Sequence, residues 1–285
     1  MHRLHIKFKI NIFLLWAASL LLLLNACSTL PDTVENDPAN TPPELAAIER
    51  LPVASQPDMG KAAEGNQINF IRTDSIRDTA LSLGARNGLA YRAKQINALL
   101  NSQAKDLDAV FNFERLLLED NILPPVLLES RDALTLAGPQ TMRVSDRSYR
   151  IIKQARFVTL PPTWREYLIM DDRLPEKPDA SLLPKTEEEY VVWVDEVRLG
   201  WAQGLKQANM IYEENLSRLK RDYQGMVRYR LLLTQKMVSA PQVAARDLGV
   251  TGGGEELSVN DRLFTIQALP SLKADSESWQ PVVTP

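Results

Sequence analysis

Residues Thr186–Met226 read TEEEYVVWVDEVRLGWAQGLKQANMIYEENLSRLKRDYQGM and carry the strongest structural signal in the chain. Thr186 and Glu189, just after Pro184, have the capping-box spacing that starts a helix. Apolar residues then recur at helical spacing over more than 30 residues, at Tyr190, Val194, Val197, Trp201, Leu205, Ala208, Tyr212, Leu219, Tyr223 and Met226. The pattern predicts one long helix, or two with a kink near Gly225, whose aromatic side chains lie in a core rather than around a ligand.

Other helical patterns lie upstream of this stretch. One covers about residues 74–100, and Ala80, Gly84 and Gly88 share one of its faces. Because glycine costs about 1 kcal/mol against alanine inside a helix, the two glycines indicate that another backbone comes close there. Further helices are expected at 107–119 and, more briefly, at 164–170.

Strand patterns complete the fold. Apolar and polar residues alternate on both sides of Ser145–Arg147 and again around Asn260–Arg262, which predicts two similar tight hairpins that pair into one small sheet. Gly252–Gly254 predicts a hairpin loop rather than a phosphate loop, because Glu255 and Glu256 follow it in place of Lys-Ser/Thr. The sequence therefore predicts an α+β fold, a predominantly helical domain with small antiparallel hairpins or a small sheet.

The N-terminus has the order of a secretory signal. The first nine residues carry three basic side chains and no acid, and Ile12–Leu24 carries no charge. Leu24-Asn25-Ala26-Cys27 follows, as in a signal with its cleavage site. A cysteine after the cut can take a diacylglycerol through a thioether, and its freed amine can then be acylated. The sequence predicts a lipoprotein signal peptide at 1–26 and lipidation of Cys27.

Other interpretations of this N-terminus fit less well. The apolar run is shorter than the roughly 20 residues that a bilayer-spanning helix needs. An ordinary signal peptide has a small residue three positions before the cut, where this chain has Leu24. A cytosolic protein would leave the basic-then-apolar order without an explanation.

Composition excludes much of the usual chemistry. Both histidines, His2 and His5, precede the cut, and Cys27 is the only cysteine. A mature chain would therefore lack the imidazole of a Ser-His-Asp relay, a free thiol and the usual ligands of zinc. Losing the three positive charges of residues 1–26 changes the net charge from -3 to -6, which does not attract nucleic acid. We expect no enzyme activity, no metal, no nucleic-acid partner and no cofactor beyond the covalent lipid on Cys27.

Carboxylate pairs are the remaining enzymatic option, because glycoside hydrolysis can use two acids without histidine. The candidate pairs are Glu119 with Asp120, Asp171 with Asp172, and Glu213 with Glu214. Adjacent residues of a helix point about 100° apart, so no such pair faces across a cleft by itself. A basic run is interleaved with acids, which favours a salt-bridged surface over a polyanion site. Its members are Arg218, Lys220, Arg221, Arg228 and Arg230.

Domain boundaries follow from composition. Residues 27–68 contain the lipidated Cys27 and recurrent prolines among polar residues, which predicts a flexible linker, with an arm that packs on the fold or a partner as the alternative. Residues 69–273 are expected to form the folded α+β domain, and 274–285 a C-terminal tail.

Several long stretches together resemble one protein family. They are ALSLGARNGLAYRAKQIN, LLLEDNILPPVLLES, SDRSYRIIKQARFVTLPPTWREYL, LLPKTEEE, NMIYEENLSRLKRDYQGM and DLGVTGGGEEL, between about Ser75 and Pro270. In this order they resemble DotC-type lipoproteins of the Dot/Icm type IVB secretion systems and related conjugative transfer systems. The linker does not resemble the family, and the chain is short after Pro270.

The resemblance implies a structural role. Such a protein would be a scaffold in the outer-membrane core complex, helping to position and stabilise a DotD-like lipoprotein and a DotH-like subunit, in multiple copies in a ring. Only the lipidated cysteine carries over, onto Cys27, and Ser28 after it favours the outer membrane, with the folded domain facing the periplasm. The alternatives are a periplasmic cell-wall glycan hydrolase or glycan-binding lipoprotein, and a free periplasmic chaperone.

Overall fold

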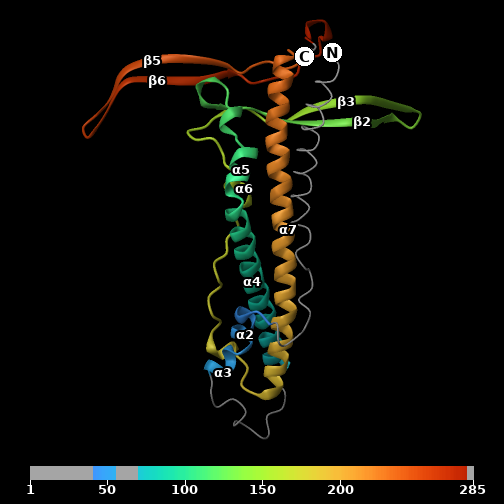
Figure 1. Cartoon of the computed structure of the whole chain (residues 1–285), viewed down its shortest axis with the longest axis vertical. Coiled ribbons are helices and arrows are strands. Elements are labelled where there is room, and N and C mark those ends of the chain that lie inside the picture. The colour runs from blue at the N-terminus through green and yellow to red at the C-terminus, as the bar shows by residue number, and fades with distance from the viewer. Residues whose placement is uncertain (1–40, 56–69, 281–285) are drawn as a thin grey trace, which may run out of the picture. The chain divides into compact units, whose positions relative to one another are not determined.

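The pattern that begins at Thr186 forms one uninterrupted helix, α7 (Glu187–Thr234), in the computed structural model (Figure 1). The backbone amide of Glu189 donates to the Thr186 hydroxyl at 3.3 Å, as the capping box requires. The Glu189 carboxylate does not return the bond to Thr186, because it accepts from the Lys185 amide at 2.8 Å instead. There is no break at Gly225, which lies inside the helix.

The structure describes residues 41–55 and 70–280. They form two compact units. Unit 1 holds the described residues up to Arg92 together with Asp172–Asn209, and unit 2 holds Ala93–Asp171 with the described residues from Met210 onwards. Helices α4 (Phe70–Ser102) and α7 each continue from one unit into the other. The sequence predicted one folded domain at 69–273, so this division is an addition to it.

Helices dominate the described part of the chain and the strands pair only in twos. Besides α4 and α7, the helices are α2 (Pro43–Glu49), α3 (Leu51–Ser55), α5 (Ala104–Val110) and α6 (Trp164–Leu168). The strands are β1 (Ile122–Leu123), β2 (Val126–Gly138), β3 (Thr141–Lys153), β4 (Arg156–Phe157), β5 (Gln242–Gly253) and β6 (Glu256–Ala268). β1 pairs with β4, β2 with β3 and β5 with β6, all antiparallel. The predicted α+β, predominantly helical fold is confirmed.

In unit 1, α4 and α7 pack backbone to backbone through glycines. A Cβ atom built on Gly88 would lie 2.5 Å from a carbonyl oxygen of α7, and one on Gly84 would overlap another. Gly200 and Gly204 approach the α4 backbone in the same way. The close approach predicted from the α4 glycines is confirmed, and α7 contributes two glycines that the sequence analysis did not single out.

The core of unit 1 forms where these helices meet. Trp193, Val197 and Trp201 of α7 are buried against α4. The α4 members of this cluster are Ile76, Ala80 and Leu83. Trp201 thus lies in a core, as predicted for the aromatic residues of the stripe, and Trp193 lies there as well. Tyr190, Tyr212 and Tyr223 of the stripe are only partly buried.

Helices α2 and α3 correct the linker prediction. Leu45 and Ile48 of α2 are buried in the unit 1 core, and Glu49 forms an ion pair with Arg198 at 2.7 Å. The prolines of this region predict a flexible linker, yet Pro43 and Pro52 occupy the first turns of α2 and α3, where a missing N–H costs nothing. The prediction is therefore wrong for residues 43–55, while 27–40 and 56–68 lie outside the described residues.

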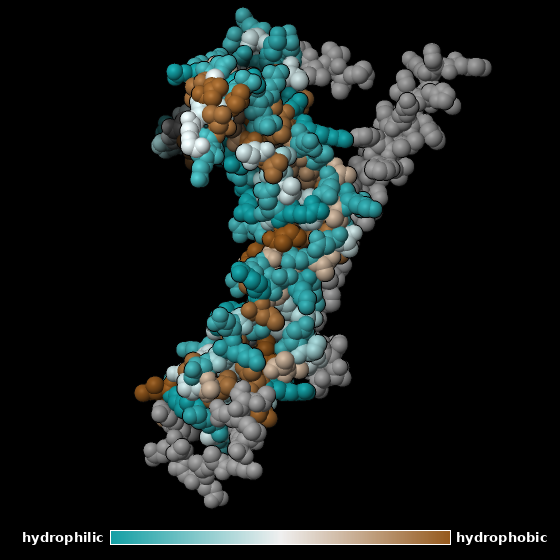
Figure 2. Space-filling model, turned by 90° about the vertical axis from the view of Figure 1, so that its left-hand side faces the viewer, coloured by the Kyte–Doolittle hydropathy of each residue, from teal (hydrophilic) through white to brown (hydrophobic). Residues whose placement is uncertain are grey.

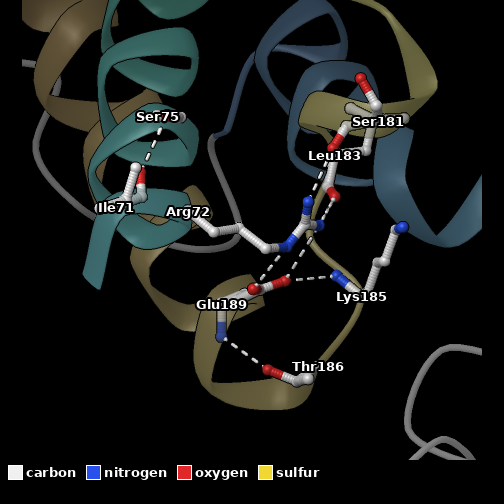
Figure 3. Close-up of polar contacts among 8 residues, drawn as sticks. All are labelled: Ile71, Arg72, Ser75, Ser181, Leu183, Lys185, Thr186 and Glu189. Atoms are coloured by element: carbon white, nitrogen blue, oxygen red, sulfur yellow. Dashed lines mark hydrogen bonds and ion pairs between the residues drawn. The ribbon is translucent and has the colours of Figure 1, made fainter. Parts of the chain in front are cut away.

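An ionic cluster joins the start of α4 to the start of α7 (Figure 3). The Arg72 guanidinium donates to the Glu189 carboxylate at 2.9 Å and to the carbonyl oxygens of Ser181 and Leu183, each at 2.8 Å. Glu189 also accepts from the Lys185 amide, so this carboxylate orders the loop before α7 as well as Arg72. The cluster fixes both helix starts in unit 1.

In unit 2 the helix predicted at 107–119 is wrong in extent. Helix α5 ends at Val110, and 3-10 turns follow at Glu114–Leu116 and Glu119–Asn121. Beyond Val110 the chain is not helical, and the aromatic residues there pack in a cluster. In this cluster Phe113 stacks on Tyr167 of the α6 helix, with ring centroids 5.9 Å apart. The short helix expected at 164–170 is confirmed as α6, which Thr163 starts with a capping box.

The predicted hairpins around Ser145–Arg147 and Asn260–Arg262 are wrong in position, and they do not pair into one sheet, because β2–β3 and β5–β6 form separate two-stranded sheets. Both segments lie in the middle of single long strands, β3 and β6, and each strand pairs with the strand before it. The true turns are at Pro139-Gln140 and at Gly254-Glu255, the second being the predicted glycine loop. The likeness between the two segments is structural, because each is part of the second strand of a two-stranded ribbon.

Residues from the predicted C-terminal tail also contact the fold. A 3-10 turn covers Ser276–Ser278, and the amide of Gln280 donates to the carbonyl oxygen of Gln235 at 2.9 Å. Residues 281–285 lie outside the described part.

Candidate interaction surfaces

Strands β2 and β3 form ribbon 1, and its tip, Ala133–Ser145, has an apolar face. Leu134 pairs with Val144 and Leu136 with Met142, and paired residues of an antiparallel ribbon project to the same side. The four side chains keep between 57% and 78% of their surface exposed. A contiguous apolar face therefore lies in solvent at the tip.

The opposite face of ribbon 1 is polar and basic. Thr135 pairs with Arg143 at the tip, and Arg131 pairs with Arg147 nearer the base. Glu129 lies within 4.0 Å of both Arg131 and Arg147 and is largely buried, with 12% of its side chain exposed. Ribbon 1 is therefore amphipathic across its two faces.

Strands β5 and β6 form ribbon 2, and its tip, Gly249–Val259, repeats this arrangement. Val250 pairs with Val259, and Leu257 pairs with Gly252, so that three large apolar side chains share one face. Each of the three is 64% or 65% exposed. The other face carries Thr251 paired with Ser258, followed by Glu256.

A bend separates the tip of ribbon 2 from its base. The pairing shifts register around Gly249, where φ is +71°, and Asn260 opposite has φ of +59°. The amide of Gly249 donates to the Asp247 carboxylate at 2.9 Å, and the hydroxyl of Thr251 donates to Asp261 at 2.6 Å. A bulge of this kind increases the local twist and redirects the strands beyond it.

The base of ribbon 1 is fixed to α7 by an arginine and a glycine. The Arg228 guanidinium donates to the Glu129 carboxylate at 3.0 Å and to the carbonyl oxygen of Leu127 at 3.1 Å. A Cβ atom on Gly225 would lie 2.5 Å from the side chain of Val126. Gly225 thus marks where the ribbon rests on the helix rather than a kink.

A buried carboxylate fixes the other strand of ribbon 1. Asp222 of α7 is fully buried and accepts from Lys153 at the end of β3, from the adjacent Arg221 at 3.1 Å and from the Tyr167 hydroxyl at 3.2 Å. Burial first, and then the charge of Asp222, raise the pKa of Tyr167 to about 12. Three elements of unit 2 therefore meet at this carboxylate.

The base of ribbon 2 is held by hydrogen bonds to the end of α7. The hydroxyl of Tyr229, whose ring is fully buried, donates to the carbonyl oxygen of Ser239 at 3.0 Å. The Ser239 amide in turn donates to the carbonyl oxygen of Ser271, just beyond β6, at 2.9 Å. Both ribbons are thus anchored in unit 2 at one end and extend away from its helices at the other (Figure 1).

Such ribbons are suited to binding. A two-stranded sheet is marginally stable in water by itself and gains from a layer packed on its apolar face. Clustered exposed apolar side chains with polar surroundings mark interaction sites. Figure 2, viewed from the side to which ribbon 2 extends, shows hydrophobic surface beside hydrophilic surface in that region. We therefore take the two ribbon tips as the candidate functional surfaces.

The site predicted from the sequence, Cys27, lies outside the described residues. Within the described residues, no group of three His, Cys, Asp or Glu side chains is placed to hold a metal ion. The same part of the chain contains no helix with the length and apolar character of a membrane span.

The carboxylate pairs lie on different elements. Glu119 and Asp120 line a cavity of about 540 Å³ in unit 2 beside Arg230, while Glu213 and Glu214 are exposed on α7. Asp171 ends a segment of unit 2, and Asp172 begins one of unit 1.

Four arginines of the basic run of α7 make contacts within unit 2. Arg221 and Arg228 pair with acids, as described, and Arg230 donates to the carbonyl oxygens of Leu116 and Leu117 at 3.2 and 2.9 Å. Arg218 lies 5.6 Å from the ring centroid of Tyr167. The salt-bridged interpretation therefore holds for Arg221 and Arg228, and the bonds of Arg230 go to backbone.

The ribbon tips were not among the functional candidates predicted from the sequence. The available signal was Gly138-Pro139-Gln140-Thr141, because proline at the second position is typical of a β-turn. With the turn placed there, Leu134, Leu136, Met142 and Val144 fall on one face.

Comparison with known proteins gives one family. The model of a family described as "Type IV secretory system, conjugal DNA-protein transfer" matches residues 70–281. These residues include both ribbons and all of α4 and α7. No curated protein matches the chain.

Proposed function

Because the chain belongs to this family of type IV secretory system and conjugal transfer proteins, we propose that it is a lipid-anchored scaffold of the outer-membrane core complex of such a machine. The finer likeness to DotC-type lipoproteins supports this assignment. The folded units would face the periplasm and bind DotD-like and DotH-like subunits. In this proposal the protein assembles partners and catalyses no reaction.

The exposed apolar faces of the two ribbon tips are the observation that carries the proposal. Leu136 and Leu257 are 78% and 65% exposed on ribbons whose other ends are fixed by Arg228, Asp222 and Tyr229. A rigid base with an apolar, solvent-exposed tip is what an assembly subunit needs, because its binding surfaces must be held in place before the partners arrive.

Lipidation of Cys27 supplies the membrane attachment in this proposal. Each buried acyl CH₂ group contributes about 0.8 kcal/mol, so two or three chains form a durable anchor. The signal-like residues 1–26 and the identity of Ser28 support attachment at the outer membrane.

The test is Cys27→Ser in cells that produce the complete secretion system. We expect the variant to fold, to leave the outer-membrane fraction and to lose transfer activity, because the partners are no longer held at that membrane. Ser28→Ala is the matched control and should fractionate and function as the wild type. Mass spectrometry of the purified protein then looks for the acyl chains directly.

Two results would contradict the proposal. One is a Cys27→Ser protein that still fractionates with outer membranes and supports normal transfer. The other is a wild-type protein without lipid. Co-purification of secretion subunits in fixed ratio after mild detergent extraction tests the scaffold role separately from the anchor.

A further inference from the structure

We propose that α2 and α3 (Pro43–Ser55), which we call the strap, hold unit 1 close to the membrane, because their docking shortens the chain between the lipid on Cys27 and the fold. This inference rests on the proposed function, since it takes the anchor at Cys27 as given. Unit 1 is then the part of the fold whose distance from the membrane is limited.

The strap docks on unit 1 through apolar contacts. Leu45 and Ile48 of α2 keep only 4% and 8% of their surface exposed and belong to the core cluster that contains Trp193. Leu51 of α3 packs against the same cluster. The other members of the cluster come from α4, from α7 and from Leu183 in the loop before α7. Helix α2 thus lies against the α4–α7 pair as part of the core of unit 1 (Figure 1).

Two polar contacts with α7 fix where α2 docks. The indole N–H of the fully buried Trp193 donates to the carbonyl oxygen of Ile48 at 3.2 Å. Carbonyl groups in the last turn of a helix have no partner inside it, so this bond satisfies one of them. One residue further, the Glu49 carboxylate pairs with Arg198 at 2.7 Å, and 13% of the Glu49 side chain is exposed. Apolar burial is not directional, whereas these two contacts select one position of α2 along α7.

Helix α2 depends on this docking. It has seven residues, and isolated helices shorter than about 12–15 residues are marginal in water. Helix formation and docking are therefore coupled. Removing the buried side chains of Leu45 and Ile48 should release the strap and unfold α2 together.

The positions of these residues in the chain turn docking into a limit on distance. Thr41, just before α2, is 14 residues after Cys27, whereas Phe70, where α4 begins, is 43 residues after it. A fully extended chain spans at most about 3.6 Å per residue. With the strap docked, Thr41 lies within about 50 Å of the lipidated residue, and with the strap released, the limit for Phe70 is about 150 Å. Docking therefore reduces the longest possible tether to about one third.

A short tether suits a subunit that must meet its partners at one membrane. The effective concentration of a tethered domain near its membrane-bound partners falls roughly as the −3/2 power of the tether length. The strap raises this concentration without adding a contact to any partner. It also fixes the side of unit 1 from which the anchor leaves, which is the side of α2.

The test inserts the same 20-residue Gly-Ser segment at one of two sites in the full-length chain, in cells that produce the whole secretion system. After Asn36 the insert lies between Cys27 and the strap and raises the distance limit by about 70 Å. After Gly60 it lies between the strap and α4 and leaves that limit unchanged. We expect the first insertion to reduce transfer about fourfold and the second to leave it at the wild-type level.

The distance itself is measured on the purified lipid-bearing chain in vesicles of phosphatidylethanolamine and phosphatidylglycerol. Leu199→Cys, at a side chain of unit 1 that is 51% exposed, takes a donor dye, because acylated Cys27 has no free thiol. Energy transfer to acceptor-labelled lipid should be equal in the chain without an insert and in the chain with the insert after Gly60. It should be lower with the insert after Asn36.

Releasing the strap gives a second test. Leu45→Asp with Ile48→Asp places two charges in the core, so the strap should leave unit 1, while the chain keeps its lipid and stays on the vesicles. Energy transfer should fall, and the two insertions should then lower it equally. Ala47→Asp, on the exposed side of the same helix, is the matched control and should behave as the wild type. The insertions leave every described residue unchanged, so their comparison decides the matter even if the double aspartate variant fails to fold.

Two results would overturn the inference. One is that both insertions reduce energy transfer and substrate transfer equally in the otherwise unchanged chain, which means that the strap does not bear the tether. The other is that the insertion after Asn36 changes neither quantity. Both results leave the lipid anchor intact, whereas a chain without lipid would not bind the vesicles and would contradict the proposed function instead.

Discussion

Single buried residues fix the base of each two-stranded ribbon to the helices of unit 2. Asp222 has no exposed surface, yet Lys153 and Tyr167 reach it from β3 and α6. Breaking such a buried network is costly, because it leaves a polar group without partners in a low-dielectric site. The sequence showed Asp222 as one acid inside a basic run, with nothing to mark it as buried, because its partners come from far away in the chain.

Tyr229 gives the residue-scale prediction, which concerns pH. Burial raises the pKa of Tyr229 to about 12, above its ordinary value of 10.0. Between these values the folded protein holds a proton that the unfolded chain loses, so the stabilisation is complete below about pH 10 and is lost as the pH rises towards 12. Tyr167, with the same raised pKa, acts in the same direction.

We expect Tyr229→Phe to reduce this alkaline loss of stability. At neutral pH the variant should be about 1 kcal/mol less stable, because it loses the hydrogen bond to Ser239. Above pH 10 the difference from wild type should shrink, because phenylalanine has no proton to lose. Urea unfolding from pH 7 to pH 11.5 measures both, and a difference that stays constant or grows above pH 10 would show that Tyr229 does not titrate as stated.

At the scale of elements, the α4–α7 pair of unit 1 is specified by glycine spacing. Gly84 and Gly88 were readable from the sequence because two glycines four residues apart in a helical pattern need a compensating contact. Gly200 and Gly204 lie in an equally regular helix and have the same spacing. Aromatic residues around them obscured the signal, which is why only half of the contact was predicted.

The corresponding prediction is Gly88→Ala. Alanine gains helix propensity, but its Cβ would lie 2.5 Å from the carbonyl oxygen of Trp201, and backbone cannot yield cheaply. Forcing the helices apart should outweigh the gain and cost about 1–3 kcal/mol. Gly138→Ala is the matched control, since nothing lies within 4 Å of the added atom, and it should be near neutral in the same urea titration. An unchanged or more stable Gly88→Ala protein would refute the close packing.

The ribbons show why strand placement failed where helix placement succeeded. Ser145–Arg147 and Asn260–Arg262 are polar and favour turns, and in a sheet with one buried face such residues would end a strand. Here both faces of each ribbon are largely exposed, so no buried face excludes them. Asn260 does adopt a positive φ, but at a bulge within β6 rather than in a turn.

Prolines misled the reading of residues 41–55 for a similar reason. Recurrent prolines such as Pro43 and Pro52 argue against regular structure in general, although a proline in the first turn of a helix is favourable. Leu45 and Ile48 then pack on the unit 1 core, which short-range patterns cannot foresee because Trp193 is distant in the sequence. Local propensity therefore predicted the secondary structure correctly only where tertiary contacts favour the same structure.

At the scale of the whole molecule, the proposed function assigns folding and binding to different parts of the chain. Residues that stabilise the two units are buried on α4 and α7 and on the segments packed against them, whereas the tips of both ribbons carry apolar side chains that unit 2 leaves exposed. The family match spans both kinds of residue. A test that separates them must remove the tips without disturbing the units.

Trimming ribbon 1 provides that test. Arg131 pairs directly with Arg147, so replacing residues 132–146 with Asn-Gly should close the shortened strands through a two-residue turn. Val250 and Val259 also pair, and the same replacement of residues 251–258 trims ribbon 2. Because the tips are exposed, each trimmed protein should unfold within about 0.5 kcal/mol of wild type.

Assembly of the secretion complex, unlike stability, should be lost on trimming. Each trimmed chain should fail to join the detergent-extracted complex and to support transfer, although it folds and fractionates with the membrane, because the apolar faces that bind are gone. Loss of stability in a trimmed chain would mean that the tip packs on its own unit. Normal assembly by both trimmed chains would mean that the exposed faces of Leu136 and Leu257 are not binding surfaces, and the scaffold role would then have to rest on the helical surfaces of the two units.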